Sequence, residues 1–339
     1  MFKQFALSLL AGTTLMASGS INPSQAQDEK KASSRPHMDL AFCIDTTGSM
    51  QGEIDMVKTK TKQLVAKLSS GKPAPIVRVG LVAYRDHGDA YVTKVYPFTD
   101  DVDKVVKDIS DLRADGGGDG PEAVDQGLHA ALKELKWDDS KHTAKLLFLI
   151  GDAGPHGAAT DLDWRKDCRE AIANGVQINT IGCSGLESYP TKQGVDVFKQ
   201  IAQLTDGKYE TLAYRQEIVD ASGHRETFVR EGGAVLKVKN RAPEWKKAVA
   251  TGAMDKVSPS FGSAAGSVAA ATITTRGIMG PPPLPASSAS MASASPRRAM
   301  VGGKDMTADI PDSRTENNLD DIMLRAAQQK AKKSLNVGY

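Results

Sequence analysis

The sequence is poor in several features on which common classes of binding protein depend. Phe, Trp and Tyr make up only 5% of the 339 residues, which argues against a surface that stacks nucleic-acid bases. The formal net charge is +2, so the overall charge does not indicate binding to nucleic acid or to an anionic membrane. There is no internal repeat, and beyond the N-terminal region no segment is apolar for long enough to span a bilayer as a helix. The content of 40% hydrophobic and 25% charged residues is ordinary for a globular protein. The length allows one good-sized α/β domain with additional segments.

Cysteine is also scarce, with three residues at Cys43, Cys168 and Cys183. Their spacing matches no zinc ribbon and no Cys-x-x-Cys motif. Cys43 and Cys183 lie within apolar, strand-like runs, so we expect them to be buried and inert. A disulfide between Cys168 and Cys183 remains an alternative, although an odd number of cysteines leaves at least one thiol unpaired.

The N-terminal residues have the pattern of a secretory signal. Lys3 provides a positive charge, an apolar stretch continues to about Met16, and small residues precede a cleavage site after Ala26. The apolar stretch is too short and too interrupted to span a bilayer, and no Cys near it would carry a lipid anchor. We therefore expect a signal over residues 1–26 that directs export to the periplasm or outside the cell, followed by a polar linker over residues 27–36.

From residue 38 onward, apolar strand-like runs alternate with segments of helical periodicity. We expect strands near residues 38–44, 76–84, 91–98, 145–150, 176–183 and 208–212, and helices near residues 50–68, 102–112, 123–135, 160–174, 193–205 and 214–231. This alternation predicts a doubly wound, Rossmann-like α/β fold, with a mostly parallel central sheet flanked by helices. A turn at residues 86–89 joins two strands as a hairpin, which predicts one antiparallel edge strand. The loops after the carboxyl ends of the strands then lie along one edge of the sheet, where such folds bind ligands.

The composition changes after about residue 240. Residues 257–305 are rich in Ser, Ala, Gly and Pro, which predicts a segment without fixed structure. A helical pattern returns from Glu316. We therefore divide the chain into a folded domain at 37–232, a connecting segment at 233–256, a low-complexity linker at 257–315 and a C-terminal helix at 316–339.

Oxygen-bearing side chains follow the first predicted strand. Asp45, Thr47 and Ser49 occur at every second position, a spacing that lets three side chains converge in an irregular loop. Carboxylate and hydroxyl oxygens suit hard divalent cations such as Mg²⁺, Ca²⁺ or Mn²⁺. The alternative is a helix N-cap, because Ser and Thr commonly cap the free N–H groups at the start of a helix. The pentad alone does not separate the two interpretations.

Two further acidic loops are expected at the same edge of the sheet. The glycine-rich loop at residues 115–122 contains Asp119, and the loop at residues 150–157 contains Asp152. Carboxylates gathered at one edge repel one another unless a cation lies between them. The three loops together therefore favour a metal site over a simple helix cap.

These motifs resemble the metal-ion-dependent adhesion site of von Willebrand factor type A domains. The order is the same: Asp-x-Thr-x-Ser after the first strand, a glycine-rich loop, and then an Asp after the fourth strand. The resemblance covers residues 37–232. It implies that a divalent cation is bound by Asp45, Thr47, Ser49 and Asp152, the last directly or through water, with Asp119 in the middle position. That position is usually a Thr that follows two glycines, so Asp119 is a departure from the pattern.

Longer strings narrow the resemblance further. Residues 84–89, 116–123 and 152–157 resemble the branch of the family found beside alpha-kinase domains and in many bacterial exported proteins, in which an Asp at position 119 is unexceptional. The remaining segment of the chain lacks the glycine-rich phosphate loop that a kinase domain requires.

The resemblance implies a binding module, not an enzyme. Mg²⁺ is the expected cation, with Ca²⁺ or Mn²⁺ as alternatives, and a protein partner would supply a carboxylate to an open coordination position. One alternative is a metal-dependent hydrolase, for which His156 or Glu122 would be the general base. Another is a structural envelope protein in which the metal only stabilises the fold. Glu122 itself has two interpretations, a residue that complements the helix dipole or one that supports the metal ligands.

Overall fold

The structure is a computed structural model. It describes residues 35–118, 120–157, 162–188, 193–220, 225–231, 234–238, 245–256, 297–301, 304–308 and 316–339. The predicted signal and Asp119 lie outside the described residues. The described helices and strands belong to one compact unit, Pro36–Tyr339. Among these helices, none is long and apolar enough to cross a membrane.

The central sheet has six strands in the order β3-β2-β1-β4-β5-β6. Their bounds are His37–Asp45 for β1, Ile76–Tyr84 for β2, Thr93–Thr99 for β3, Thr143–Gly151 for β4, Val176–Gly182 for β5 and Tyr209–Thr211 for β6. All neighbouring pairs are parallel except β2 and β3, which are antiparallel. The predicted mostly parallel sheet with one antiparallel edge strand is therefore confirmed.

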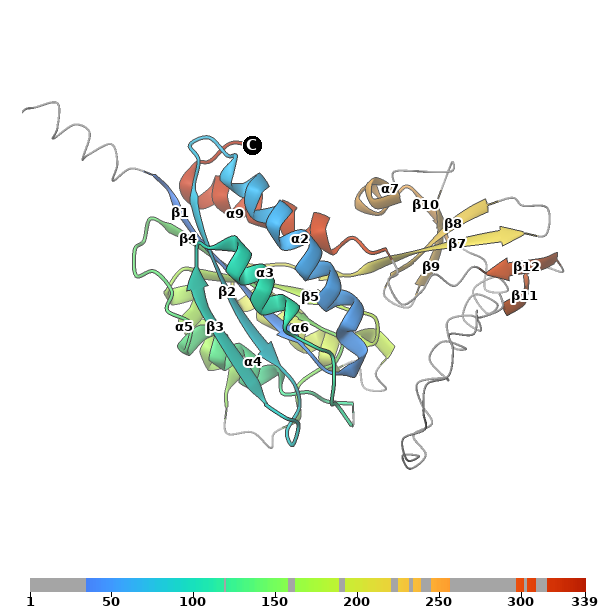
Figure 1. Cartoon of the computed structure of the whole chain (residues 1–339), viewed down its shortest axis with the longest axis horizontal. Helices are drawn as coiled ribbons and strands as arrows, with labels where there is room; N and C mark the ends of the chain where they lie inside the picture. The colour runs from blue at the N-terminus through green and yellow to red at the C-terminus, as the bar shows by residue number, and fades with distance from the viewer. Residues whose placement is uncertain are drawn as a thin grey trace, which may run out of the picture. The chain divides into compact units, whose positions relative to one another are not determined.

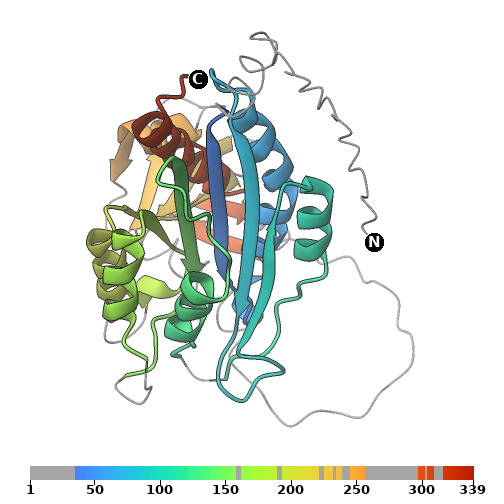
Figure 2. The same ribbon diagram turned by 90° about the vertical axis from the view of Figure 1, so that its left-hand side faces the viewer.

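Helices cover both faces of this sheet (Figures 1 and 2). The helices that cover it are α2 (Gln51–Ser69), α3 (Val102–Ser110), α4 (Val124–Lys133), α5 (Trp164–Ala173), α6 (Gln193–Leu204) and α9 (Leu319–Leu335), with short 3-10 helices η1 (Gly48–Met50) and η2 (Leu186–Ser188). A further helix, α7 (Trp245–Thr251), packs elsewhere, with Ala213, Val229 and Val238. Apolar side chains of α2, α3 and α9 pack with Leu40 and Phe42 on one face, whereas those of α4, α5 and α6 pack with Ala41 and Cys43 on the other. Because both faces are covered, β1 and β4 are continuous buried runs rather than alternating ones.

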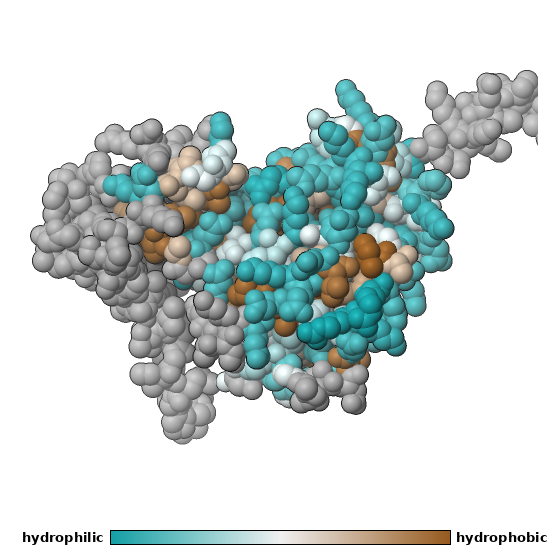
Figure 3. All heavy atoms as spheres, turned by 180° about the vertical axis from the view of Figure 1, so that it is seen from behind, coloured by the Kyte–Doolittle hydropathy of each residue, from teal (hydrophilic) through white to brown (hydrophobic). Residues whose placement is uncertain are grey.

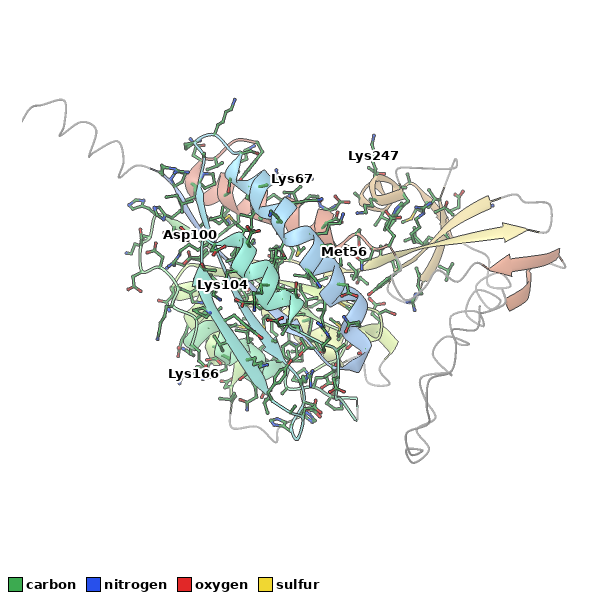
Figure 4. All side chains as sticks on the ribbon, viewed as in Figure 1. Met56, Lys67, Asp100, Lys104, Lys166 and Lys247 are labelled. Carbon is green, nitrogen blue, oxygen red and sulfur yellow. The ribbon has the colours of Figure 1, made fainter. Side chains whose placement is uncertain are left out.

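The solvent side of these helices is mostly polar, with Ile172 of α5 and Leu204 of α6 as exposed apolar exceptions. Lys67 on α2 and Lys104 on α3 are exposed and mark the outer surfaces of their helices (Figure 4). Asp101 caps α3, since its side chain accepts a hydrogen bond from the Lys104 backbone N–H at 3.0 Å.

The prediction of a helix over residues 214–231 is wrong. This segment forms a hairpin of β7 (Ala213–Asp220) and β8 (Arg225–Glu231), which pair in an antiparallel manner. The segment contains β-branched residues such as Ile218, Val219 and Thr227, which suit a strand, but its apolar residues also recur at helical spacing, so the local sequence does not decide between the two. The hairpin belongs to a second sheet of order β10-β9-β8-β7-β12-β11. Its other strands are β9 (Ala234–Val238), β10 (Met254–Lys256), β11 (Arg297–Val301) and β12 (Lys304–Ala308).

The predicted C-terminal helix is confirmed as α9, and it packs on the central sheet beside α2. Its buried side chains join the same apolar core as β1 and β4; they are Leu319, Ile322, Met323, Ala326, Ala327 and Ala331. Both ends of α9 are held by hydrogen bonds to other segments of the chain. Before the helix, the Asn318 side chain accepts a hydrogen bond from the Ala213 N–H at 2.9 Å. After it, Gly338 and Lys72 exchange two backbone hydrogen bonds, each 2.9 Å. In the sequence, the second sheet is therefore inserted between β6 and α9, the helix that completes the apolar core against the central sheet.

Candidate metal site

The loops that follow β1 and β4 meet at the carboxyl edge of the central sheet. Parallel pairing of these two neighbouring strands brings Asp45 close to the loop that contains Asp152. The glycine-rich loop joins them, because the Gly48 N–H donates to the Gly116 carbonyl at 3.3 Å and the Asp115 N–H donates to the Thr46 carbonyl at 3.1 Å. Three segments far apart in the sequence thus lie together at this edge.

Asp45 is the most deeply buried carboxylate of the site, with no exposed surface. Its Oδ1 accepts hydrogen bonds from the Thr47 N–H at 2.8 Å and from the Thr47 hydroxyl at 2.7 Å. Its Oδ2 is buried and has no hydrogen-bond partner among the residues that the structure describes. Burial, followed by the charges of Asp152 and Glu53, raises the pKa of Asp45 to about 8. Burial of a carboxylate oxygen without a hydrogen-bond donor or a cation beside it is energetically unfavourable, so this atom indicates a binding partner.

The helix-cap alternative is not supported by the geometry. Thr47 is the residue before η1, yet its side chain makes no capping hydrogen bond, and neither does Met50 before α2. The Thr47 hydroxyl instead donates to Asp45. Ser49 is exposed in the 3-10 turn at the same edge. The hydroxyl of Thr47 therefore organises the carboxylate and does not cap a helix.

Glu122 lies beside these residues and is also buried. Its N–H donates to the Gly154 carbonyl at 2.9 Å, and its Oε2 has no hydrogen-bond partner within the described part of the chain. Burial and the carboxylates of Asp45, Asp86 and Asp152 raise its pKa to about 9. Since α4 begins at Val124, Glu122 precedes the helix, and its surroundings favour a role beside the metal ligands over one in the helix dipole.

The glycine-rich loop approaches Glu122 and Thr47 closely because of Gly117. This residue has a φ of 72°, and a Cβ at this position would lie 2.9 Å from Glu122 Oε1 and 3.1 Å from Thr47 Cβ. A side chain here would separate the loop from the site, so the position requires glycine.

The turn between β2 and β3 buttresses the same loop, which the sequence did not predict. Asp89 Oδ2 accepts from the Gly117 N–H at 3.0 Å and from the Asp86 N–H at 3.1 Å. The His156 ring lies with Nε2 2.5 Å from Asp86 Oδ1, and its centroid is 5.3 Å from that of His87. The string Asp-His-Gly-Asp was visible in the sequence, but nothing in its spacing indicated that Asp89 supports a residue 28 positions further on.

A second set of residues near the site was also missed. Glu53, in the first turn of α2, is buried, and its Oε1 accepts a hydrogen bond from the Tyr214 hydroxyl at 2.6 Å. The same hydroxyl accepts from the Ser184 N–H at 3.0 Å. No local pattern links residues 161 positions apart, so only the fold reveals this contact.

Of the five predicted metal ligands, Asp45 and Thr47 are in direct contact and Ser49 is in the same loop. The charge of Asp152 acts on Asp45, and Asp119 is not among the described residues. The described residues contain no group of three His, Cys, Asp or Glu side chains placed to hold a metal.

The cysteines take no part in the site. Cys43, Cys168 and Cys183 are all buried and unpaired, so the alternative disulfide between Cys168 and Cys183 is absent. Burial raises the pKa of Cys168 to about 12, which makes this thiol unreactive.

The fold and the loops at its carboxyl edge define a von Willebrand factor A domain. The sequence model of that family, described as "von Willebrand factor A domain", matches residues 39–212. This is more than half of the chain, and the protein belongs to this family. Domains of this family generally serve adhesion and protein interaction.

Relatives share this domain in proteins that are otherwise much longer. The chain is 31% identical over 121 residues to "Alpha-protein kinase vwkA" of Dictyostelium discoideum, covering 35% of this chain and 19% of that protein. It is 34% identical over 125 residues to "von Willebrand factor A domain-containing protein 7" of Homo sapiens, covering 36% of this chain and 13% of that protein. The chain therefore matches less than a fifth of the length of either relative.

Solved structures show more distant similarity. BatB from Bacteroides thetaiotaomicron aligns with a TM-score of 0.37 and 14% identity, over 52% of this chain and 89% of that one. Proximal thread matrix protein 1 from the mussel byssus aligns with a TM-score of 0.39 and 19% identity, over 52% of this chain and 42% of that one.

Proposed function

We propose that this von Willebrand factor A domain binds a divalent cation at the carboxyl edge of its sheet and uses it to bind a protein partner. The observation that carries the proposal is the Oδ2 atom of Asp45, which is buried and lacks a hydrogen-bond partner in the described structure. A cation is the partner that suits such an atom, because it satisfies the oxygen and offsets the charge of Asp152 at once.

The residues available to hold the cation are those that the family resemblance implies. They are Asp45, Thr47, Ser49, Asp119 and Asp152. All of their donor atoms are oxygens, which favours Mg²⁺ and allows Ca²⁺ or Mn²⁺. Two of the five donors are hydroxyls and Asp119 lies outside the described residues, so this set is compatible with the absence of a described cluster of three acidic or imidazole side chains. When bound, the cation supplies an open coordination position for a partner's carboxylate.

The electrostatics of the site support the proposal. The pKa of Asp45 and the pKa of Glu122 are both raised. The charge of Asp152 contributes to both shifts, and the charge of Asp45 contributes to that of Glu122. A bound cation would lower the energy of the ionised forms of these carboxylates together. On the face of the molecule shown in Figure 3, hydrophobic residues form only small patches among hydrophilic ones.

The proposal is binding without turnover. A hydrolase would need a general base near the cation, and His156 has its Nε2 2.5 Å from Asp86. That contact engages the imidazole in bracing one loop against another. Glu122 is buried beside the glycine-rich loop, where it is placed to support the ligands.

Calorimetric titration with MgCl₂ tests cation binding, with CaCl₂ and MnCl₂ in parallel. The wild-type chain is expected to bind, and Asp45→Asn is expected to lose binding. Asp103→Asn is the matched control, because it removes the same charge from an exposed residue of α3 that pairs with Lys62 of α2 and not with the loops of the site. Equal heats for all three proteins would contradict the metal site.

Partner binding is tested by capture from the native cell envelope on immobilised wild-type and Asp45→Asn chains. A partner retained by the wild type in Mg²⁺, and released by EDTA, is the expected result. Cation binding without such a partner would favour the structural alternative, and metal-dependent cleavage of generic phosphoester or peptide substrates would favour the hydrolase. Export is part of the same proposal, and N-terminal sequencing is expected to show a mature chain that begins near Gln27. Retention of Met1 would contradict it.

A further inference from the structure

One side chain joins the second sheet to the edge that carries the candidate metal site. Tyr214 is the second residue of β7, outside the region that the family model matches. Its side chain is buried, with a relative exposure of 7%. The phenol donates a hydrogen bond to Glu53 at 2.6 Å and accepts one from the Ser184 N–H at 3.0 Å.

Both partners of the phenol are neighbours of the metal loops. Glu53 lies one helical turn after Ser49, in the first turn of α2, and is buried there. Ser184 precedes Gly185, where a Cβ would lie 3.2 Å from the Asp152 carbonyl oxygen and 3.4 Å from its Oδ2. The phenol therefore fixes the distance between the start of α2 and the segment that packs against Asp152.

Tyr214 is held in place from the side of the inserted segment. On β8, Arg230 is its ladder partner, and the guanidinium lies 5.3 Å from the centroid of the phenol ring. Tyr214 also forms a β-bridge with Asn317, just before α9. The Arg215 N–H, next along β7, donates to the Glu316 carbonyl at 2.9 Å. The position of the phenol thus depends on the β7–β8 hairpin and on the entry to α9.

We propose that Tyr214 is a positioning residue through which the second sheet sets the cation affinity of the site. The proposal rests on the proposed metal-binding function. Removal of a group that holds a metal ligand in position typically weakens the affinity of the site for the metal. Here a shift of the phenol would move Glu53, next to the loop of Ser49, and Ser184, next to Asp152. By thermodynamic linkage, cation binding then stabilises the seating of the β7–β8 hairpin to the same extent.

Calorimetry with MgCl₂ on the full chain tests the affinity. Tyr214→Phe removes only the hydroxyl and is expected to raise the Kd about 10-fold. Tyr209→Phe is the control, because its hydroxyl contacts Thr211 and not Glu53, and it is expected to keep the wild-type Kd. Arg230→Ala loosens the ring from the side of β8 with the hydroxyl intact. It is expected to weaken binding in the same direction, and it keeps the test decisive where Tyr214→Phe does not fold.

Hydrogen exchange of the β7 amides supplies the reciprocal measurement. Mg²⁺ is expected to slow exchange over Ala213–Asp220 in the wild type, and to have no such effect in Tyr214→Phe. If the variants lose thermal stability in EDTA but keep the wild-type Kd and the Mg²⁺-dependent protection, Tyr214 is a packing residue only and the inference is overturned. In that case the metal site stands, provided Asp45→Asn still abolishes binding. A wild-type chain that binds no Mg²⁺ overturns both proposals.

Discussion

The raised pKa of Asp45 predicts an unusual dependence of stability on pH in the absence of metal. The folded-state pKa is about 8 against an ordinary value of 3.8. Between these values the folded chain holds a proton that the unfolded chain has lost, so the free energy of unfolding decreases as pH rises. The slope from this one group approaches about 1.4 kcal/mol per pH unit. From pH 5 to pH 7 it amounts to about 3 kcal/mol, and Glu122, with a pKa raised to about 9, acts in the same direction.

Asp45→Asn isolates this contribution. The amide does not ionise, and its presence also removes a charge that raises the pKa of Glu122. In EDTA the variant is therefore expected to lose less stability than the wild type as pH rises, and to be the more stable of the two near pH 8. Saturating Mg²⁺ is expected to reverse this order. The cation binds the deprotonated wild-type site, and at 100 times the Kd it contributes about 2.7 kcal/mol.

Urea denaturation at pH 5, 6, 7 and 8, with EDTA or with MgCl₂, measures these differences. Urea is uncharged and does not screen the carboxylates, whereas guanidinium would. The difference between wild type and variant cancels the other titrating groups, and Asp103→Asn controls for loss of a negative charge elsewhere. If wild type and Asp45→Asn have parallel stability profiles in EDTA, and Mg²⁺ leaves both unchanged, the reasoning about the buried carboxylate is wrong.

Three further predictions follow from particular contacts. Thr47→Val leaves Asp45 without its hydroxyl partner and is expected to weaken Mg²⁺ binding at least about 10-fold by calorimetry; an unchanged Kd would exclude a role at the site. Met323→Ala opens a cavity in the core and is expected to cost about 2–5 kcal/mol in urea unfolding, whereas Lys332→Ala, on the exposed side of α9, is expected to have little effect. Gly207→Ala places a Cβ against a backbone carbonyl of β5 and is expected to cost more than about 2 kcal/mol. Gly157→Ala meets open space, and equal stability of the two glycine variants would refute the steric argument.

The central sheet was predictable because its signal is local. Strands β1 and β4 are buried on both faces, so each appears in the sequence as an unbroken apolar run between polar loops. The site residues followed from the same logic, since parallel strands place their following loops at one edge. The geometry of the site was not predictable to the same degree. The unsatisfied Oδ2 of Asp45 depends on the exact approach of loops that the sequence only places at the same edge.

The second sheet was not predictable because its signal is not local. The segment over residues 214–231 has apolar residues at helical spacing, and the choice between helix and hairpin depends on what each residue packs against. Phe228 and Val229 are adjacent, and both are buried, a pattern that helical spacing allows and strict strand alternation does not, so the local pattern favoured the wrong element. The hydrogen bond from Tyr214 to Glu53 joins residues 161 positions apart, and the sequence around neither residue indicates it.

The place of α9 in the core determines when this domain can fold. If the insertion between β6 and α9, about 100 residues long, were a flexible loop, its closure would cost about 3 kcal/mol more than that of a five-residue turn. Burial of two of the side chains Leu319, Ile322 and Met323, at about 1.5–3 kcal/mol each, offsets that cost. The order of synthesis is a separate constraint. Strand β1 is made first, and α2 and α3 cover part of its apolar face early, but this face is fully covered only after the residues of α9 have left the ribosome. Every shorter nascent chain exposes the part of that face on which α9 packs, so completion of the core comes late, and a chain interrupted within the insertion would be a substrate for chaperones and proteases.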